Sequence, residues 1–503
     1  MEFTLGYSLK RSAWKFGEKT AVVFEGNRIN YDELNRRANR LANAFLKLGI
    51  KKGDKIASML FNSPEIIEAY YAAAKIGAIT VPVNFRLVGR EVEYIIDQSE
   101  SSTFIYDADL RNVIEKFSAR RDLNLISVGK NEYSGSMNYE KLIADSIDSE
   151  VDVPVNEKDL RFIMYTSGTT GVPKGAMFTH SNNLWAALSI IIAKKYDFND
   201  VVLIVNPLFH MNSYINVIAS IFMGNKVVVM KSFDPVRMME LIESEKVTIC
   251  SVVPTICKRL IEASEDYQFN TESWRYCTCT GSLWPVEMKK VFMSKFPHVV
   301  MADAYGATEV FAGTIIESPE MVKKLQSVGR PYLDTLIRIV DKQGNDLKPG
   351  QIGEIIFYGP HVTKGYYNNL EATDEALKNG WFCSGDLGYF DEDGYLFFVD
   401  REKDMIISGG ENIYSAEIEN VLLRHDKVFE VAVVGVPDDK WVEAVKAYIV
   451  LLDQAEMDED EVINFCKEHL ASYKRPKHIE FVKLLPKNQM GKVLKKELKD
   501  RNK

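Results

Sequence analysis

The chain has 503 residues, which is too long for one ordinary hydrophobic core and predicts roughly two to four domains or subdomains. Hydrophobic residues account for 46% and charged residues for 26%, proportions that indicate a folded globular protein and exclude a disordered or fibrous one. The formal net charge of -9 argues against a general nucleic-acid binder, because affinity for phosphate backbones needs clustered Lys and Arg side chains. No nucleic acid is therefore expected as a partner.

The cysteines and the hydropathy pattern predict a cytoplasmic protein. Six cysteines are present, and their spacing fits neither paired zinc ligands nor the framework of a secreted disulfide protein. The first residues lack the basic and apolar regions of a signal peptide, and no stretch reaches the roughly 18 uninterrupted apolar residues of a transmembrane helix. We therefore expect reduced thiols and no integral membrane segment.

Helices and strands are expected to alternate through the N-terminal part of the chain. Residues 31–48 carry apolar side chains at a helical period. A strand is predicted at 55–60, followed by a helix with Ser63 as its N-cap, Pro64 at its first position and Gly77 at its end. Further strands are predicted at 78–83, 201–204, 226–230 and 248–253. This βαβ alternation predicts an α/β fold with parallel sheets.

The pattern changes after about residue 327 to short alternating segments separated by turn signals, which predict a small β-rich subdomain. Its strands are expected to include 353–358 and 395–399. A compact α+β unit is predicted to follow, with helices at 415–423 and 459–469 and strands at 428–436 and 445–452. We place a domain boundary at Asp400-Arg401, which gives a large N-terminal domain, residues 1–399, and a small C-terminal domain, residues 400–503.

The strongest local signal is the run Tyr-Thr-Ser-Gly-Thr-Thr-Gly-Val-Pro-Lys-Gly at residues 165–175. Hydroxyl side chains, permissive glycines, free backbone N–H groups and one lysine together suit a cradle for polyphosphate. The run is not a Walker A sequence, because no Ser or Thr follows the lysine. A simple Gly/Thr surface turn is the alternative interpretation. The residues predicted to bind phosphate are Thr166, Ser167, Gly168, Thr169, Thr170 and Lys174.

Five motifs in one order resemble those of the adenylate-forming superfamily, which includes acyl-CoA synthetases, peptide-synthetase adenylation domains and firefly luciferase. The first is the run at 165–175, and the second, Tyr-Gly-Ala-Thr-Glu at 305–309, is similar to the family's aromatic-Gly-x-Thr-Glu motif. Ser-Gly-Asp at 384–386 resembles its ribose-binding motif, Asp-Arg-Glu-Lys-Asp at 400–404 its hinge, and Pro-Lys-Asn-Gln-Met-Gly-Lys at 486–492 its catalytic-lysine motif. The resemblance covers essentially the whole chain.

This resemblance implies how ATP and Mg²⁺ are held. Glu309, with Thr166, would bind Mg²⁺, although a lone Glu is more often a solvated carboxylate. Asp386 would accept hydrogen bonds from both ribose hydroxyls, a task suited to a carboxylate, with Arg401 assisting. Tyr305 would stack on adenine. The rest of the implied nucleotide-binding set is Gly281, Ser282, Gly306, Lys403 and Thr308, the last of which is also placed among the catalytic residues with Glu309.

The resemblance also implies catalytic and CoA-binding residues. Lys492 would place its ammonium between the substrate carboxylate and the α-phosphate as negative charge develops. The C-terminal domain would then rotate at the hinge, withdraw Lys492 and present Gly409 and Gly410, whose small size suits a narrow pantetheine passage. His210 matches a catalytic-site residue between the acyl pocket and the thiol tunnel, although a lone His beside apolar residues is more often a packed structural one. Lys231 resembles a CoA contact.

The acyl pocket is expected to mix apolar and polar groups, so it does not indicate a long bare alkyl tunnel. Its predicted lining is Asn212, Ser213, Tyr214, Asn216, Val310, Phe311 and Gly313.

The implied function is ATP-dependent ligation of a carboxylic acid to coenzyme A through an acyl-adenylate, with release of AMP and pyrophosphate. A medium- or long-chain fatty acid is the expected substrate, because the sequence resembles fatty-acid:CoA and coumarate-type ligases. An aryl acid, a carnitine-like acid and the loading of a carrier protein stay open. A silent nucleotide-binding protein is disfavoured by the intact Lys492, Glu309 and Asp386. The expected partners are the acid, ATP and CoA, and a homodimer stays open.

Overall fold

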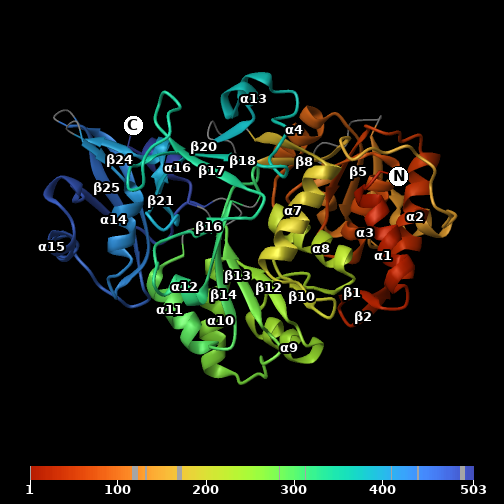
Figure 1. Cartoon of the computed structure of the whole chain (residues 1–503), viewed down its shortest axis with the longest axis horizontal. Coiled ribbons are helices and arrows are strands. Elements are labelled where there is room, and N and C mark those ends of the chain that lie inside the picture. Colours follow the sequence, from red (N-terminus) through yellow and green to blue (C-terminus); the bar gives the residue numbers. More distant parts are fainter. Residues whose placement is uncertain are drawn as a thin grey trace.

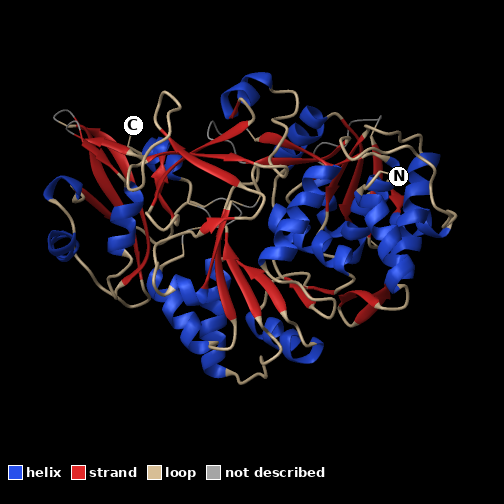
Figure 2. Cartoon of the chain, in the orientation of Figure 1, coloured by secondary structure: helices blue, strands red, loops and turns tan. Residues whose placement is uncertain are grey.

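The computed structural model describes residues 2–115, 123–130, 133–166, 173–282, 284–311, 313–408, 411–438, 441–487 and 493–502. Their strands form four sheets, and helices cover the sheet faces in an α/β arrangement (Figure 1). The N-terminal two thirds hold two large, mainly parallel sheets, and the C-terminal third holds two smaller, mainly antiparallel ones (Figure 2). The expected fold class, with a large N-terminal part and a small C-terminal one, is confirmed.

The first large sheet has seven strands and ends in the hairpin that carries the predicted phosphate loop. Its order is β7 (Met137–Asn138), β6 (Asn124–Val128), β5 (Ser101–Asp107), β3 (Lys55–Met59), β4 (Ile79–Pro82), β8 (Leu160–Thr166) and β9 (Lys174–Thr179). All neighbours are parallel except β8 and β9, which pair antiparallel. Helices α4 (Gly89–Ser99) and α5 (Arg111–Ile114) pack on the outer face of this sheet, whereas α6 (Tyr139–Ala144) packs on the inner side against α2 and α3.

The second large sheet has nine strands. Its order is β16 (Arg330–Pro331), β15 (Thr314–Glu317), β14 (Val300–Tyr305), β13 (Tyr276–Thr280), β12 (Ile249–Val252), β10 (Val201–Ile204), β11 (Lys226–Val229), β1 (Thr20–Phe24) and β2 (Asn27–Asn30). Helices α9 (Pro235–Glu245), α10 (Pro254–Asp266) and α11 (Val286–Lys295) pack on its outer face, where they bury Cys250, Cys257, Cys277 and Cys279. Residues that alternate with these cysteines along β12 and β13 face inward.

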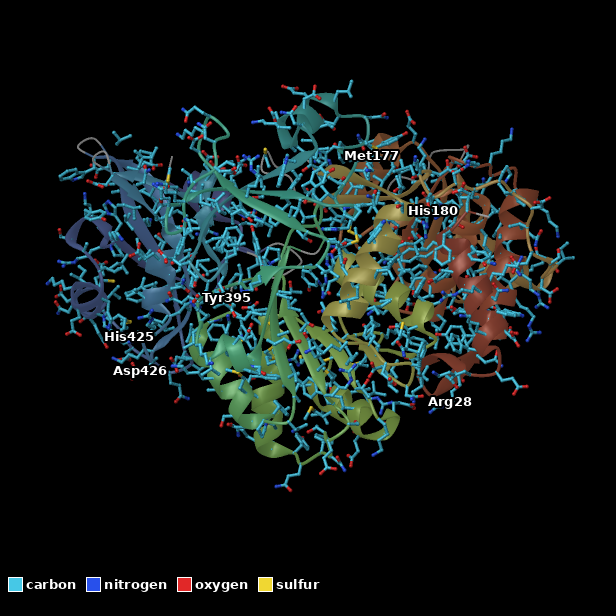
Figure 3. All side chains as sticks on the ribbon, viewed as in Figure 1. Arg28, Met177, His180, Tyr395, His425 and Asp426 are labelled. Atoms are coloured by element: carbon cyan, nitrogen blue, oxygen red, sulfur yellow. The ribbon has the colours of Figure 1, made fainter. Side chains whose placement is uncertain are left out.

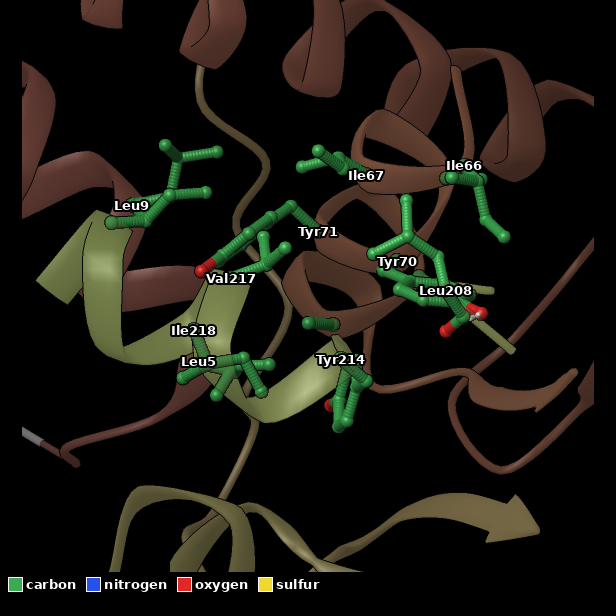
Figure 4. Close-up of a cluster of buried hydrophobic side chains, with 14 of the residues drawn as sticks. Leu5, Leu9, Ile66, Ile67, Tyr70, Tyr71, Leu208, Tyr214, Val217 and Ile218 are labelled. Carbon is green, nitrogen blue, oxygen red and sulfur yellow. Dashed lines mark hydrogen bonds between the residues drawn. The ribbon is translucent and has the colours of Figure 1, made fainter. Parts of the chain in front are cut away.

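A helical layer lies between the two large sheets. It consists of α1 (Leu5–Phe16), α2 (Tyr31–Lys47), α3 (Pro64–Ile76), α7 (His180–Ala193) and α8 (Met211–Met223). His180, which begins α7 and is labelled in Figure 3, is buried, and its Nδ1 accepts a hydrogen bond from the Leu5 N–H at 3.2 Å. Side chains of α1, α3 and α8 pack together in the hydrophobic core that Figure 4 shows, and Tyr71, Tyr214 and Ile218 are among them.

The smaller sheets lie toward the C-terminus. One contains β17 (Leu336–Val340), β18 (Gly353–Tyr358), β19 (Leu377–Lys378), β20 (Trp381–Phe390) and β21 (Leu396–Arg401), with α12 (Ser318–Met321) and α13 (Leu370–Ala376) nearby. The other contains β22 (Ile406–Ser408), β23 (Glu411–Ile413), β24 (Val428–Asp438), β25 (Val442–Leu451) and β26 (His478–Phe481), with α14 (Ser415–Leu422), α15 (Glu459–His469) and α16 (Lys495–Asp500).

The expected elements are present, with boundaries that differ by a few residues. Pro64 begins α3, and Gly77 ends it with a φ of 70°, a left-handed value that glycine adopts without strain. Ser63 occupies the predicted N-cap position, and its side chain makes no capping hydrogen bond there. The predicted boundary at Asp400-Arg401 falls on the last two residues of β21 and stays a prediction. In the described residues, no helix combines the length and apolarity that a membrane crossing needs.

Candidate active site

The loops after the parallel strands of the nine-stranded sheet meet at one edge, and β14 delivers Tyr305 to it. The chain then turns back into β15, and two glycines make this turn feasible. A Cβ atom on Gly306 would lie 2.8 Å from the carbonyl oxygen of Phe311, and one on Gly313 would lie 2.7 Å from that of Tyr305. These positions therefore exclude side chains unless the backbone moves, and the tight turn they permit presents Glu309.

Glu309 connects three segments that are far apart in the sequence. Its Oε1 accepts hydrogen bonds from Thr166 Oγ1 at 3.2 Å and from Tyr366 Oη at 2.9 Å. Its carbonyl oxygen accepts from the Thr363 N–H at 2.8 Å, and the Thr363 hydroxyl donates to the Met177 carbonyl on β9 at 2.9 Å. The carboxylate is thereby fixed at the loop end of the β8–β9 hairpin, beside the predicted phosphate loop.

The groups around Glu309 fit a magnesium ion that is bound chiefly through substrate phosphates. Glu309 is 9% exposed, and in the parts of the chain that are described no Lys or Arg pairs with it. The same parts contain no cluster of three or more acidic, His or Cys side chains that could hold a metal alone. Mg²⁺ typically takes one or two carboxylates and completes its shell with water and phosphate oxygens. One carboxylate oxygen and the Thr166 hydroxyl are hard donors of the kind it prefers.

A second carboxylate lies across the turn from Glu309. Asp386, on β20, accepts a hydrogen bond from Tyr305 Oη at 2.7 Å through Oδ2, and Arg401 Nε lies 3.3 Å from Oδ1. Burial raises the pKa of Tyr305 well above its usual value, and the adjacent Asp386 carboxylate adds to this, so the phenol stays a hydrogen-bond donor. Asp386 and Arg401 are opposite each other in the β20–β21 register. The structure thus brings together Tyr305, Asp386 and Arg401, which were predicted to hold the adenine and the ribose.

The other residues predicted to bind nucleotide lie around this pair. Gly281 and Ser282 are exposed directly after β13, and Gly281 has a φ of 94°, which favours glycine. Thr308 lies half-buried in the turn that holds Glu309. Lys403 is exposed in the short 3₁₀ helix Glu402–Asp404 that follows Arg401.

Part of the predicted site lies outside the described residues. This applies to the four phosphate-loop positions Ser167, Gly168, Thr169 and Thr170, to the predicted catalytic Lys492, and to Gly409 and Gly410. The residues that flank the phosphate loop are described. Thr166 and Lys174 are opposite each other in the β8–β9 pair, and Lys174 Nζ lies 5.4 Å from the centroid of the Tyr366 ring.

His210 lies at the N-terminal end of α8, in the helical layer. It is the N-cap of α8, and its ring lies 4.2 Å from that of Phe209. Burial lowers the pKa of His210 to about 3, with a further contribution from the Arg86 charge, so the imidazole is neutral at physiological pH. Lys231, predicted to contact CoA, follows β11 at an exposed position, and its Nζ lies 5.6 Å from the Phe61 ring centroid.

The residues predicted to line the acyl pocket along α8 do not all point in the same direction. Asn212 is partly exposed near His210, and Asn216 lies one helical turn deeper on the same face of α8. Ser213 and Tyr214 instead face the core, because their hydroxyls donate to the Asn206 carbonyl and to Asn183 Oδ1. Sequence reasoning missed Tyr366, which binds the Glu309 carboxylate and carries no local signal in the sequence.

Comparison with known proteins gives one consistent group. A family model described as AMP-binding enzyme matches residues 9–367, and one described as AMP-binding enzyme C-terminal domain matches residues 417–492. The chain is 36% identical to a feruloyl-CoA synthase from Amycolatopsis, covering 96% of each chain. It is 37% identical to the long-chain-fatty-acid–CoA ligase FadD13 from Mycobacterium tuberculosis, covering 94% of this chain and 93% of that one. The solved structure of o-succinylbenzoate coenzyme A synthetase from Bacillus subtilis, with ATP and magnesium ion, is 31% identical with a TM-score of 0.88 and covers 98% of this chain and 99% of that one.

Proposed function

Because the chain belongs to the AMP-binding enzyme family, as an AMP-forming acid:CoA ligase, we propose that it activates a compact carboxylic acid, aryl or short-chain, for transfer to coenzyme A. One observation supports this size limit. Lys194 Nζ donates hydrogen bonds to Asn216 Oδ1 on α8 at 2.9 Å and to Ser251 Oγ on β12 at 2.7 Å. These bonds close the layer between α8 and the inner face of the sheet, where a long alkyl chain would meet a buried charge.

The proposed reaction begins with attack of the acid's carboxylate on the α-phosphate of ATP, which gives the acyl-adenylate and pyrophosphate. Mutual repulsion of the anions is the main obstacle, and cations and oriented dipoles reduce it. We assign Glu309 and Thr166 to Mg²⁺, which neutralises phosphate charge when it is bound. Lys174 would face the phosphates from β9, and Lys492 would act at the reacting carboxylate.

The nucleoside would be held by Tyr305, Asp386 and Arg401. A carboxylate has about four lone-pair sites, so Asp386 can keep its bonds to Tyr305 and Arg401 and still accept from two ribose hydroxyls. The thiol of CoA would then attack the acyl carbon and release AMP. His210, neutral and packed on Phe209, would separate the acid from the thiol passage without adding charge, with Lys231 on the CoA side.

A medium- or long-chain fatty acid is the second candidate, supported by the 37% identity to FadD13. The test is pyrophosphate release and acyl-CoA formation with ATP, Mg²⁺ and a panel of aryl, short-chain and long-chain acids, with and without CoA. Compact acids are expected to give the highest kcat/KM. A maximum at long-chain acids would overturn the size limit, and product only with a phosphopantetheinylated protein would favour a carrier-protein ligase.

Two variants make the assay specific for this site. Glu309→Gln removes the carboxylate charge at constant shape and is expected to abolish most acid-dependent pyrophosphate release. Glu240→Gln is the matched control, because Glu240 lies exposed on α9 and, among the described residues, forms an ion pair with Arg237 one turn away. Equal losses in both variants would show that the assay reports folding and not the site.

A further inference from the structure

Within the described part of the chain, one buried lysine lacks a negatively charged partner. Lys194 follows α7 and is 1% exposed, and both of its hydrogen-bond acceptors, Asn216 and Ser251, are neutral. Among the described residues no carboxylate pairs with its ammonium. An ammonium has three donors, so one N–H remains after these two bonds. Burying a charge without a counter-charge is costly, so this arrangement needs a reason.

The other buried lysines that the structure describes are all ion-paired. Lys75 Nζ lies 3.0 Å from Glu150, and Lys289 Nζ lies 2.5 Å from Asp303. The fold thus supplies a carboxylate for a structural buried lysine. Lys194 is the exception. Its hydrogen bond to Asn216 connects it to Asn212, a residue of the predicted acyl pocket.

A second unsatisfied group lies beside the Ser251 that binds Lys194. Thr278, on β13, is opposite Ser251 in the parallel β12–β13 register, so both side chains leave the same face of the sheet. That face is the inner one, because the flanking Cys250 and Cys277 belong to the core of the outer helices. Thr278 is 2% exposed, and its Oγ1 has no hydrogen-bond partner among the described residues. Five other buried hydroxyls in the described residues also lack a partner, and Thr278 differs from them by its place beside Ser251.

Lys194 and Thr278 are each connected by short steps to residues of the predicted site. Asn216 connects the partly exposed Asn212 to Lys194 through hydrogen bonds. Its Nδ2 donates to Asn212, and its Oδ1 accepts from Lys194 and from Tyr196 Oη. Thr278 precedes Gly281, at the rim of the site, by three residues of strand, or roughly 10 Å. The Thr278 hydroxyl and the Lys194 ammonium are thus two buried donors on either side of Ser251, on the inner side of the sheet.

We propose that Lys194 and Thr278 bind a second carboxylate at the far end of the acid substrate, which makes this enzyme selective for compact dicarboxylic acids. The inference rests on the proposed function, since it requires the acid to lie between α8 and the inner sheet face. The distal carboxylate supplies the counter-charge that Lys194 lacks among the described residues, and it accepts a hydrogen bond from the Thr278 hydroxyl, which donates to none of them. The same ammonium repels a quaternary ammonium tail, which disfavours carnitine-like acids, and leaves a methyl end without compensation.

The test compares acids that differ only at the far end: adipic against hexanoic, suberic against octanoic, and para-carboxycinnamic against para-methylcinnamic acid. In the wild type at least one dicarboxylic acid is expected to exceed its partner in kcat/KM for acyl-CoA formation by roughly 100-fold or more, as loss of one member of a buried charge pair predicts. In Lys194→Met this ratio is expected to fall toward one. Thr278→Val, which keeps side-chain shape, is expected to lower it about tenfold. Lys195→Met is the control, because Lys195 is exposed and forms its one described ion pair with Glu317.

The outcomes separate the two proposals. Acid-dependent pyrophosphate release with the monocarboxylic members and no preference for any dicarboxylic acid would overturn this inference and leave the proposed function standing. Release with none of the acids would overturn the proposed function itself. If Lys194→Met fails to fold, Thr278→Val decides, because an unchanged preference there contradicts the assignment. A purely structural role for Lys194 predicts equal losses with both members of each pair.

Discussion

Tyr305 and Asp386 are joined by a hydrogen bond of 2.7 Å from the phenol to Oδ2, while Arg401 Nε lies 3.3 Å from the other carboxylate oxygen. Tyr305 lies on β14, Asp386 on β20 and Arg401 on β21. The hydrogen bond therefore links the nine-stranded sheet to the five-stranded sheet that contains β17–β21. The raised pKa of Tyr305 keeps the phenol protonated. The carboxylate is therefore oriented by the protein itself, and its free lone pairs are aimed before a nucleotide is bound.

Replacing Asp386 by Asn is expected to raise the KM for ATP by about tenfold or more, because an amide turns donor N–H groups toward donor hydroxyls. Tyr305→Phe is expected to have a smaller effect, since Arg401 still orients the carboxylate. Pyrophosphate release as a function of ATP concentration measures both, and thermal unfolding checks that each variant is folded. An unchanged KM for ATP in Asp386→Asn would contradict a role in binding the ribose.

Glu309 and Tyr366 make the second measurable pair. Glu309→Gln is expected to shift the Mg²⁺ dependence of pyrophosphate release to higher concentration and to lower the saturated rate by roughly 100-fold or more, because a neutral amide is a poor ligand for a hard cation. Tyr366→Phe removes a hydrogen bond of 2.9 Å that only orients the carboxylate, and a loss of about tenfold or less is expected. A Glu309→Gln enzyme with the wild-type Mg²⁺ curve would exclude the metal role.

Much of the fold could be predicted from local sequence patterns, whereas the burial of Lys194 and Thr278 could not. The helix at α3 was predicted from Pro64 and Gly77, signals that act within one turn. Lys194 is different, because a lysine at the end of a helix reads as solvated, and its burial depends on packing against β12 and α8. Thr278 likewise looks like an ordinary strand residue, since β-branched residues favour strands. Its unpaired hydroxyl is visible only once β13 is placed beside β12.

Lys492 is expected to act in one half-reaction only. With Lys492→Ala, acid-dependent pyrophosphate release should fall by roughly 100-fold or more, because a positive charge at the forming bond is lost. The same variant given synthetic acyl-adenylate and CoA is expected to form acyl-CoA at near the wild-type rate. Lys487→Ala is a control from the same segment, since Lys487 pairs with Glu430 on β24. Equal losses in both half-reactions would contradict the assignment.

The buried histidines predict how stability depends on pH. Burial lowers the pKa of His180 and of His210 to about 3, below the value of about 6.5 for an unfolded histidine. Between these values the unfolded chain binds more protons, so the free energy of unfolding is highest above pH 6.5 and falls as pH drops toward 3. Each histidine adds a slope of up to about 1.4 kcal/mol per pH unit in that window.

Urea unfolding between pH 5 and 7.5 measures this slope. His180→Gln is expected to reduce it by the share of one histidine, even though the overall stability falls, because a glutamine has no proton to bind. His478→Gln, at an exposed position in β26, is the matched control. An unchanged slope in His180→Gln would show that its imidazole is protonated in the folded protein, and the bond from the Leu5 N–H to Nδ1 would then need another explanation, because a protonated imidazole has no acceptor.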